Sequence, residues 1–231
     1  MLEIIANTVE DAINIEQGGG DRIELVSALS EGGLTPSYGL IKQVLEAVKI
    51  PVNVMIRPHS NSFVYSEGDL QVMLEDIEQA KALGANGIVL GMLDPDGNIA
   101  LEQLNGVLGH CQGLEVTFHR AIDETKDILA STRLLAKTSI TRVLSSGGPG
   151  NAEDNLVVLR EMRNILDGAG MFLLAGSSVN ADNCQAILQA TGADELHVGN
   201  GVRPGRPPFA GVGLQAVERM AKAYRQAVAR L

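Results

Sequence analysis

The chain has few cysteines, no tryptophan and few aromatic residues. Its 231 residues include two cysteines, Cys111 and Cys184, which stand far apart and outside any C-x-x-C spacing. Small secreted domains depend on a framework of disulfides, and zinc sites depend on closely spaced cysteines. The scarcity of cysteine argues against both classes of protein and favours a reducing, intracellular environment.

The chain also has no long apolar run and an excess of negative charge. No stretch reaches the ~18 consecutive apolar residues of a membrane-spanning helix, and no basic segment with a long apolar core begins the sequence. Lys and Arg total 18 against 28 Asp and Glu, which gives a formal charge of −10. So acidic a chain repels phosphate backbones and anionic lipid headgroups. We therefore expect a cytoplasmic protein with neither nucleic-acid nor membrane partners.

Histidine is scarce as well. The four histidines show no H-x-x-H or H-E-x-x-H spacing, and the methionines lie in apolar strands or helices. These patterns predict no metal site, and no cofactor is evident from them.

Short apolar runs recur along the whole chain and predict buried parallel strands. They are LEIIA (2–6), RIELV (22–26), PVNVMI (51–56), GIVLGML (87–93), LEVTF (114–118), TRVLSS (141–146), MFLLAG (171–176) and ELHVG (195–199). Their starts lie about 20 to 36 residues apart, enough for one strand, one helix and two loops. Eight such units without a linker predict a single (β/α)₈, or TIM, barrel domain over 1–231. The alternative is an open doubly wound sheet, weakened because NTVED follows the first run in place of G-x-G-x-x-G.

The stretch TFHRAID places His119, Arg120 and Asp123 at the end of the fifth run. Barrel enzymes build their sites at the carboxyl ends of the strands, and a neutral imidazole there can act as a general acid or base. Asp123 could orient His119 or instead cap the next helix. Arg120 follows directly on an extended strand, so we expect it to point away from the side that His119 faces, unless the strand already turns there. A purely structural role for His119, packed among its neighbours, is the alternative.

Glu24 lies inside the apolar run RIELV, where a carboxylate needs a charged or hydrogen-bonding partner. Arg57, at the end of the third run, is the expected partner. The two could form a structural ion pair or the charged floor of a substrate pocket. We therefore take as candidate catalytic residues Glu24, Arg57, His119 and Asp123.

Two glycine-rich loops, LSSGGPGNAEDN and LAGSSVNADN, follow the sixth and seventh runs. Backbone N–H groups and serine hydroxyls in such loops suit a phosphate or carboxylate, although helix capping selects the same residue types. His197 in the eighth run is either a pocket residue or part of the core. The candidate ligand-binding residues are Arg120, Ser146, Gly147, Gly148, Gly176, Ser177 and His197.

Five segments together resemble the CutC family of proteins named for copper homeostasis. In order they are GGGDRIELVSALSEGGLTPSYGLIK, PVNVMIRPHSNSFVYSEGDLQVMLEDI, GANGIVLGMLDPDGNI, TFHRAID and VLSSGG, and the resemblance extends over essentially the whole chain. It implies a (β/α)₈ fold, a cytoplasmic location, self-association as a dimer and a role in copper handling. Cu(I) is a cofactor that this resemblance alone implies.

The chain departs from the family pattern at positions that bear on copper. Family members commonly carry cysteine in the first strand and in the stretch that here reads IELVSAL, whereas this chain has Ile5, Ala6 and Val26. Thiolate and thioether are the ligands that Cu(I) prefers, so these replacements argue against direct copper binding. Two hypotheses stay open: a copper-homeostasis protein of the CutC kind, and an enzyme that uses His119 or Glu24 on a small phosphate or carboxylate. A purely structural scaffold fits less well, because charged residues lie at the carboxyl ends of several of the predicted strands.

Overall fold

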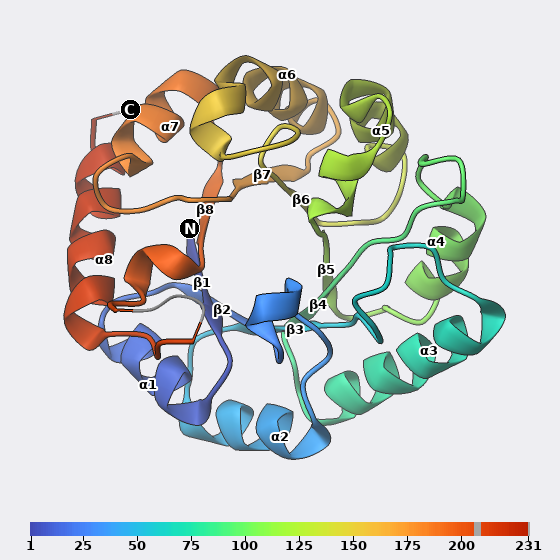
Figure 1. Ribbon diagram of the computed structural model, residues 1–231, viewed down its shortest axis with the longest axis horizontal. Coiled ribbons are helices and arrows are strands. Elements are labelled where there is room, and N and C mark those ends of the chain that lie inside the picture. Colours follow the sequence, from blue (N-terminus) through green and yellow to red (C-terminus); the bar gives the residue numbers. More distant parts are fainter. Residues whose placement is uncertain (206–208, 231) are drawn as a thin grey trace.

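The protein forms a closed barrel of eight parallel strands inside a ring of eight α-helices, within residues 1–205 and 209–230 that the computed structural model describes (Figure 1). The strands are β1 (Leu2–Ala6), β2 (Arg22–Leu25), β3 (Val52–Met55), β4 (Gly87–Leu90), β5 (Glu115–Phe118), β6 (Arg142–Ser145), β7 (Phe172–Ala175) and β8 (Glu195–Val198). The helices are α1 (Val9–Gln17), α2 (Tyr38–Ala47), α3 (Glu67–Ala82), α4 (Leu101–Leu108), α5 (Ile128–Leu135), α6 (Leu156–Asp167), α7 (Cys184–Thr191) and α8 (Leu214–Val228). Each strand pairs with its neighbours in chain order, and β8 pairs with β1. The predicted barrel is confirmed, with a strand in each predicted run, and the doubly wound alternative is wrong.

Alternation along each strand divides the side chains between two environments. In β1, Leu2 and Ile4 are buried in the large apolar core, which also includes the helix residues that face the barrel, such as Leu159 and Met162 of α6. The other side chains of the strands point into the barrel, which is why charged residues could stand inside otherwise apolar runs.

The amino end of the barrel interior holds a network of buried charges. Arg22 of β2 binds the carboxylates of Glu3 in β1 and Glu195 in β8. Arg142 of β6 reaches Glu195 (Nε to Oε2, 3.0 Å) and Glu115 (Nη2 to Oε2, 2.6 Å). The buried carboxylates of Glu3 and Glu195 therefore face guanidiniums, which offset the cost of removing them from water, whereas Glu115 is 42% exposed.

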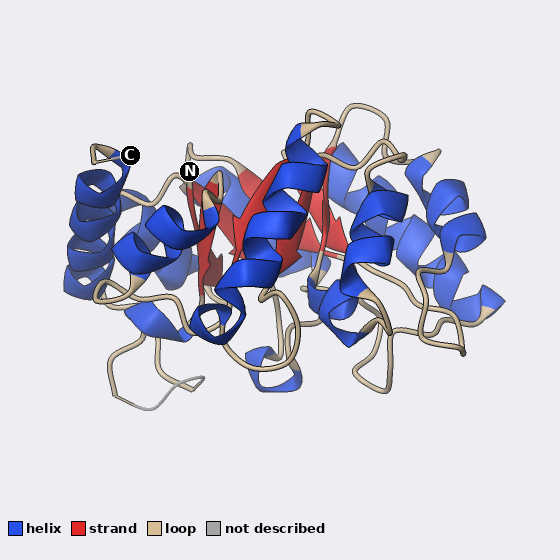
Figure 2. Cartoon of the chain, turned by 90° about the horizontal axis from the view of Figure 1, so that it is seen from above, coloured by secondary structure: helices blue, strands red, loops and turns tan. Residues whose placement is uncertain are grey.

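The loops that follow the strands gather at the opposite end. Figure 2 shows them along the lower edge of the molecule, away from the N-terminus at the upper edge. The described parts of these loops contain four short 3₁₀ helices: η1 (Leu29–Glu31), η2 (Arg120–Glu124), η3 (Ala152–Asn155) and η4 (Asn200–Val202). Viewed along the barrel, η1 lies over its opening (Figure 1). No helix in the described part of the chain has both the length and the apolar character for crossing a bilayer.

Candidate functional site

A cavity of about 270 Å³ opens at the carboxyl ends of the strands. Six of the residues singled out in the sequence line it, although they come from five different strands or the loops after them: Glu24, Arg57, His119, Arg120, Ser177 and His197. The remaining five are not among its lining residues: Asp123, Ser146, Gly147, Gly148 and Gly176. The other lining residues are the apolar Ile5, Leu29, Met55, Phe63 and Leu144, the polar Ser178 and Asn200, and two glycines, Gly32 and Gly199.

Glu24 contributes a carboxylate from inside β2 that is almost completely buried. Its Oε2 lies 3.5 Å from Nε2 of His197, and its Oε1 has no hydrogen-bond partner among the residues that the structure describes. Burial raises the pKa of Glu24 to about 7. The negative charge of Glu3 also raises this pKa, whereas the charge of His197 lowers it. The carboxyl can therefore gain or lose a proton near neutral pH.

The partner expected for Glu24 was Arg57, and the structure differs. Among the ion pairs of the described residues, Glu24 pairs with His197, whereas Arg57 Nη1 donates to the backbone carbonyls of Glu31 (2.8 Å) and Gly33 (3.1 Å). Arg57 lies two residues beyond the end of β3, so its side chain reaches the η1 loop. Its guanidinium also lies over the ring of Phe63, with Cζ 4.8 Å from the ring centroid. Arg57 thus holds in place the loop that contains η1, which lies over the opening of the barrel (Figure 1).

His197 connects Glu24 to the charged network below it. Its Nδ1 lies 2.9 Å from Oε1 of Glu3, which in turn binds Arg22. Burial lowers the pKa of His197, but the carboxylates of Glu24 and Glu3 outweigh burial and raise it. Burial would raise the pKa of Glu3, yet Arg22 and His197 lower it to about 2. Glu3 is therefore ionised and orients the imidazole that faces Glu24.

His119 follows β5 and forms the N-cap of η2. Its Nδ1 accepts a hydrogen bond from the backbone N–H of Ala121 (3.2 Å), so in the neutral ring the proton is on Nε2. Nε2 has no partner in the described part of the chain. Burial, and then the charge of Arg57, lower the pKa of His119 to about 3. Gly91 makes room for this ring, since a Cβ there would overlap Nδ1. His119 is thus a neutral N–H donor on the cavity wall.

The neutral state of His119 predicts a pH dependence of stability. Because its pKa is about 3 in the folded chain and 6.5 for an unperturbed histidine, unfolding takes up a proton between these pH values. The free energy of unfolding therefore falls as pH decreases through this window, by up to about 1.4 kcal/mol per pH unit. We expect His119→Gln to lack this contribution. Between pH 7 and pH 5, urea denaturation should show wild type losing about 2 kcal/mol more than the variant.

The exposed His110, replaced by Gln, controls for the loss of a histidine. An equal pH dependence of wild type and His119→Gln would contradict a neutral His119.

Asp123 neither orients His119 nor caps α5, whose N-cap is Asp127. Its carboxylate accepts hydrogen bonds from the backbone N–H of Ser146 (3.0 Å), from the hydroxyls of Ser145 and Ser146, and from Arg120 Nε (2.9 Å). The N–H and hydroxyl of Ser146 that were expected to hold an anion are therefore occupied by a carboxylate of the chain itself.

Arg120 lines the same cavity as His119, contrary to the alternation expected along an extended strand. The strand ends at Phe118 and the chain turns into η2 at Arg120, so the two neighbours do not point to opposite sides. Arg120 Nη2 donates to Ser146 Oγ (2.9 Å), and its side chain keeps 44% of its surface exposed.

Sequence reasoning missed Glu3 and Phe63. Glu3 stands inside the apolar run LEIIA as Glu24 stands inside RIELV, and this same pattern could have identified it. Phe63 lies in the loop after β3, and its ring centroid lies 4.9 Å from that of His119. No local pattern marks it, because its contact with His119 depends on how the loop folds back over the barrel.

Together the fold and cavity define a (β/α)₈-barrel protein whose strands end, on their carboxyl side, at a cavity lined by ionisable side chains. The family model described as the CutC family matches residues 1–202. A human relative named "Copper homeostasis protein cutC homolog" is 41% identical over 197 residues, covering 85% of this chain and 72% of that protein. A CutC family protein of Enterobacter sp. (strain 638) is 40% identical over 197 residues, covering 85% of this chain and 78% of its own. The chain belongs to the CutC family.

One solved structure agrees with this assignment. The crystal structure of the putative copper homeostasis protein CutC from Streptococcus agalactiae has a TM-score of 0.79 and 34% identity, and the match covers 86% of this chain and 97% of the other. Thiamine phosphate pyrophosphorylase from Pyrococcus furiosus, at 16% identity and a TM-score of 0.62, shares the fold alone.

Proposed function

We propose that this protein contributes to copper homeostasis, the process for which its relatives are named, by binding a small anionic molecule in the barrel cavity and not by holding Cu(I) itself. The observation that carries this proposal is the composition of the cavity. Two guanidiniums and two imidazoles line it together with a carboxylate, while the cysteines lie elsewhere.

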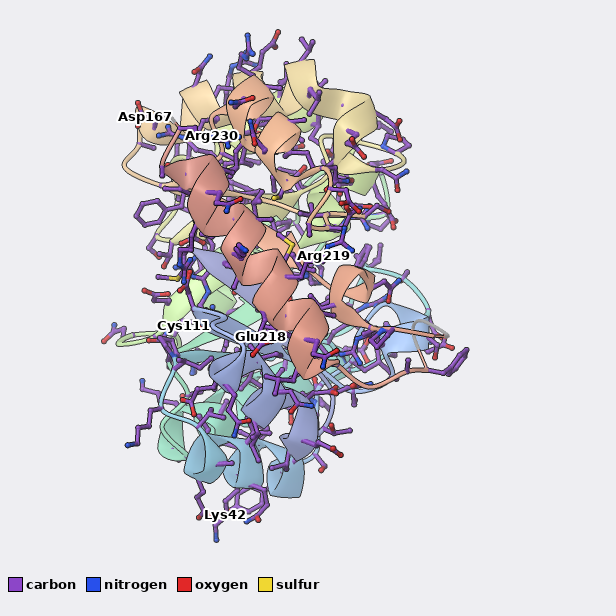
Figure 3. The ribbon with its side chains drawn as sticks, turned by 90° about the vertical axis from the view of Figure 1, so that its left-hand side faces the viewer. Lys42, Cys111, Asp167, Glu218, Arg219 and Arg230 are labelled. Atoms are coloured by element: carbon purple, nitrogen blue, oxygen red, sulfur yellow. The ribbon has the colours of Figure 1, made fainter. Side chains whose placement is uncertain are left out.

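The donors present do not fit a Cu(I) site. Cys111 and Cys184 are buried and do not line the cavity, and Figure 3 shows Cys111 at the end of the barrel away from η4. Burial raises the pKa of both thiols, that of Cys111 to about 11, which disfavours the thiolate that binds metal. The cavity wall has one thioether, Met55, and Nε2 of His119 carries a proton.

Glu3, Glu24 and His197 are the only group in the described residues whose ligand atoms lie close enough for an ion, all within 4.8 Å of one another. Two carboxylates and one imidazole are harder ligands than Cu(I) prefers. Glu3 is moreover already neutralised by Arg22.

An anion is the complementary ligand. Arg57 and Arg120 both line the cavity, and Nε of Arg57 has no partner in residues 1–205 and 209–230. Guanidinium forks bind carboxylates and phosphates with paired hydrogen bonds. A cavity of about 270 Å³ restricts the ligand to a small molecule.

A second function, acid–base catalysis, is favoured by Glu24 and His119. Both line one cavity, both have a buried polar atom without a partner in the described chain, and their pKa values are displaced in opposite directions, to about 7 and about 3. Groups whose environments separate their protonation states in this way are typical of acid–base sites.

One preparation can test the proposed function. Anaerobic competition should show no tight one-equivalent Cu(I) complex, and a thermal-shift screen of small carboxylates and phosphates should give stabilising ligands. A ligand at ~100 times its Kd adds about 2.7 kcal/mol of stability. The stabilisation should disappear in Arg57→Gln and persist in Arg133→Gln, a matched control on the exposed face of α5. One equivalent of tightly bound Cu(I) without any ligand shift would contradict the proposal.

A further inference from the structure

His119 determines what a ligand must present to one side of the cavity. Its Nδ1 is held as an acceptor by Ala121, so Nε2–H can only donate. A buried donor without a partner is unfavourable, and a ligand oxygen that accepts from it would remove this cost. The neutral ring can hydrogen-bond to a ligand oxygen on which negative charge develops, and the ring keeps its proton while it does so. A carbonyl oxygen meets these requirements.

Arg57 lies near enough to this residue for its charge to lower the pKa of His119. Phe63 contacts both residues, with its ring 4.9 Å from the His119 ring and 4.8 Å from the Arg57 guanidinium carbon. The carbonyl oxygen and the anionic group of a ligand should therefore be near each other in the molecule. A carboxylate directly bonded to the carbonyl carbon keeps these two groups of the ligand on neighbouring atoms.

Glu24 determines what the ligand presents on the other side. Its Oε1 lacks a partner in the described residues, and its strand neighbour in the register is the apolar Ile5, which also lines the cavity. A carboxylate with one oxygen free of hydrogen bonds, next to an apolar side chain, is suited to take a proton from carbon.

From this arrangement we propose that the cavity binds small 2-oxo carboxylates and enolises them, with Glu24 as the base, His119 as the donor to the carbonyl oxygen and Arg57 as the carboxylate ligand. The inference rests on the acid–base function proposed above and names its substrate class.

The step balances within the substrate and Glu24. Glu24 takes a proton from C3, the C–H electron pair becomes the C2=C3 bond, and the carbonyl π pair moves onto the oxygen that His119 hydrogen-bonds. Return of the proton from Glu24 to C3 restores the 2-oxo acid. If Glu24 exchanges its proton with solvent before the return, the hydrogens at C3 are replaced by those of the solvent. The step consumes no oxidant, reductant or second substrate.

Proton NMR of 2-oxobutanoate in D₂O can follow this exchange. Wild type should remove the C3 proton signal faster than buffer does, with a rate that rises with pH and levels off above about 7, where Glu24 is ionised. Glu24→Gln should lower the enzymatic rate at least ~100-fold. Glu46→Gln, which removes an exposed carboxylate on α2, is the matched control and should exchange at the wild-type rate. Thermal unfolding of each variant checks that it is folded.

The outcomes separate the two proposals. Stabilisation by 2-oxobutanoate without exchange above the buffer rate overturns the enolisation and leaves anion binding standing. Neither stabilisation by any small anion nor exchange overturns both. Exchange that persists in folded Glu24→Gln overturns the assignment of the base.

Discussion

Arg22→Ala is expected to lower the free energy of unfolding by about 3–5 kcal/mol. Arg22 is fully buried inside the barrel, where it binds the carboxylates of Glu3 and Glu195. Removing the guanidinium leaves both carboxylates in a low-dielectric interior with less compensation, and it leaves a space where a long side chain was packed. Urea denaturation monitored by far-UV circular dichroism measures the loss.

An exposed arginine provides the comparison for this prediction. Arg219 pairs with Asp182 on the surface, at 67% and 79% side-chain exposure, and Figure 3 shows Arg219 on the outward helix α8. Water screens such a pair, so Arg219→Ala should cost about 1 kcal/mol or less. Arg22→Lys, which keeps the charge but loses the fork, should fall between the two. If Arg22→Ala costs no more than Arg219→Ala, the buried network does not stabilise the barrel.

The position of each strand could be predicted because a parallel strand is covered by helices outside and by the barrel interior inside. Runs such as GIVL and RVLS therefore stand out against the amphipathic helices between them. The rule that sites form at the carboxyl ends of the strands also brought Glu24, His119 and His197 together correctly.

The pairing of the charged residues could not be predicted in the same way. The sequence suggested that Glu24 would pair with Arg57 on the adjacent strand. Glu24 of β2 instead pairs with His197 of β8, on the other side of β1. Strand tilt and stagger decide which residues lie at the same height, and neither can be read from the order of residues. His197 pairs in register with Glu3 and Glu24 with Ile5, so His197 and Glu24 flank β1 and their side chains meet inside the barrel. The cytoplasmic location and the dimer stay predictions. Light scattering, which measures the mass of the particle in solution, would test the dimer.

Asp123 was expected to assist His119 or to cap the next helix. Its observed contacts instead predict a large contribution to the free energy of unfolding. Its side chain is 5% exposed and ties the end of β6 to η2 through Ser145, Ser146 and Arg120. Asp123→Ala would leave the backbone N–H of Ser146 and the hydroxyl of Ser145 buried without their acceptor. At about 1–3 kcal/mol for each such group, we expect a loss near 3 kcal/mol in the free energy of unfolding. Asp123→Asn, which keeps the size and one acceptor oxygen, should lose less.

The same contacts make a prediction about anions. The donors around Asp123 already form an anion site whose occupant is a side chain of the protein. Removing that carboxylate frees the Ser146 N–H and the Arg120 guanidinium for an ion from solution. Inorganic phosphate should therefore raise the melting temperature of Asp123→Ala more than that of wild type, by restoring the missing charge. Equal phosphate effects on the two proteins would contradict this prediction. They would mean that the loop after β6 keeps its conformation only when the Asp123 carboxylate is present.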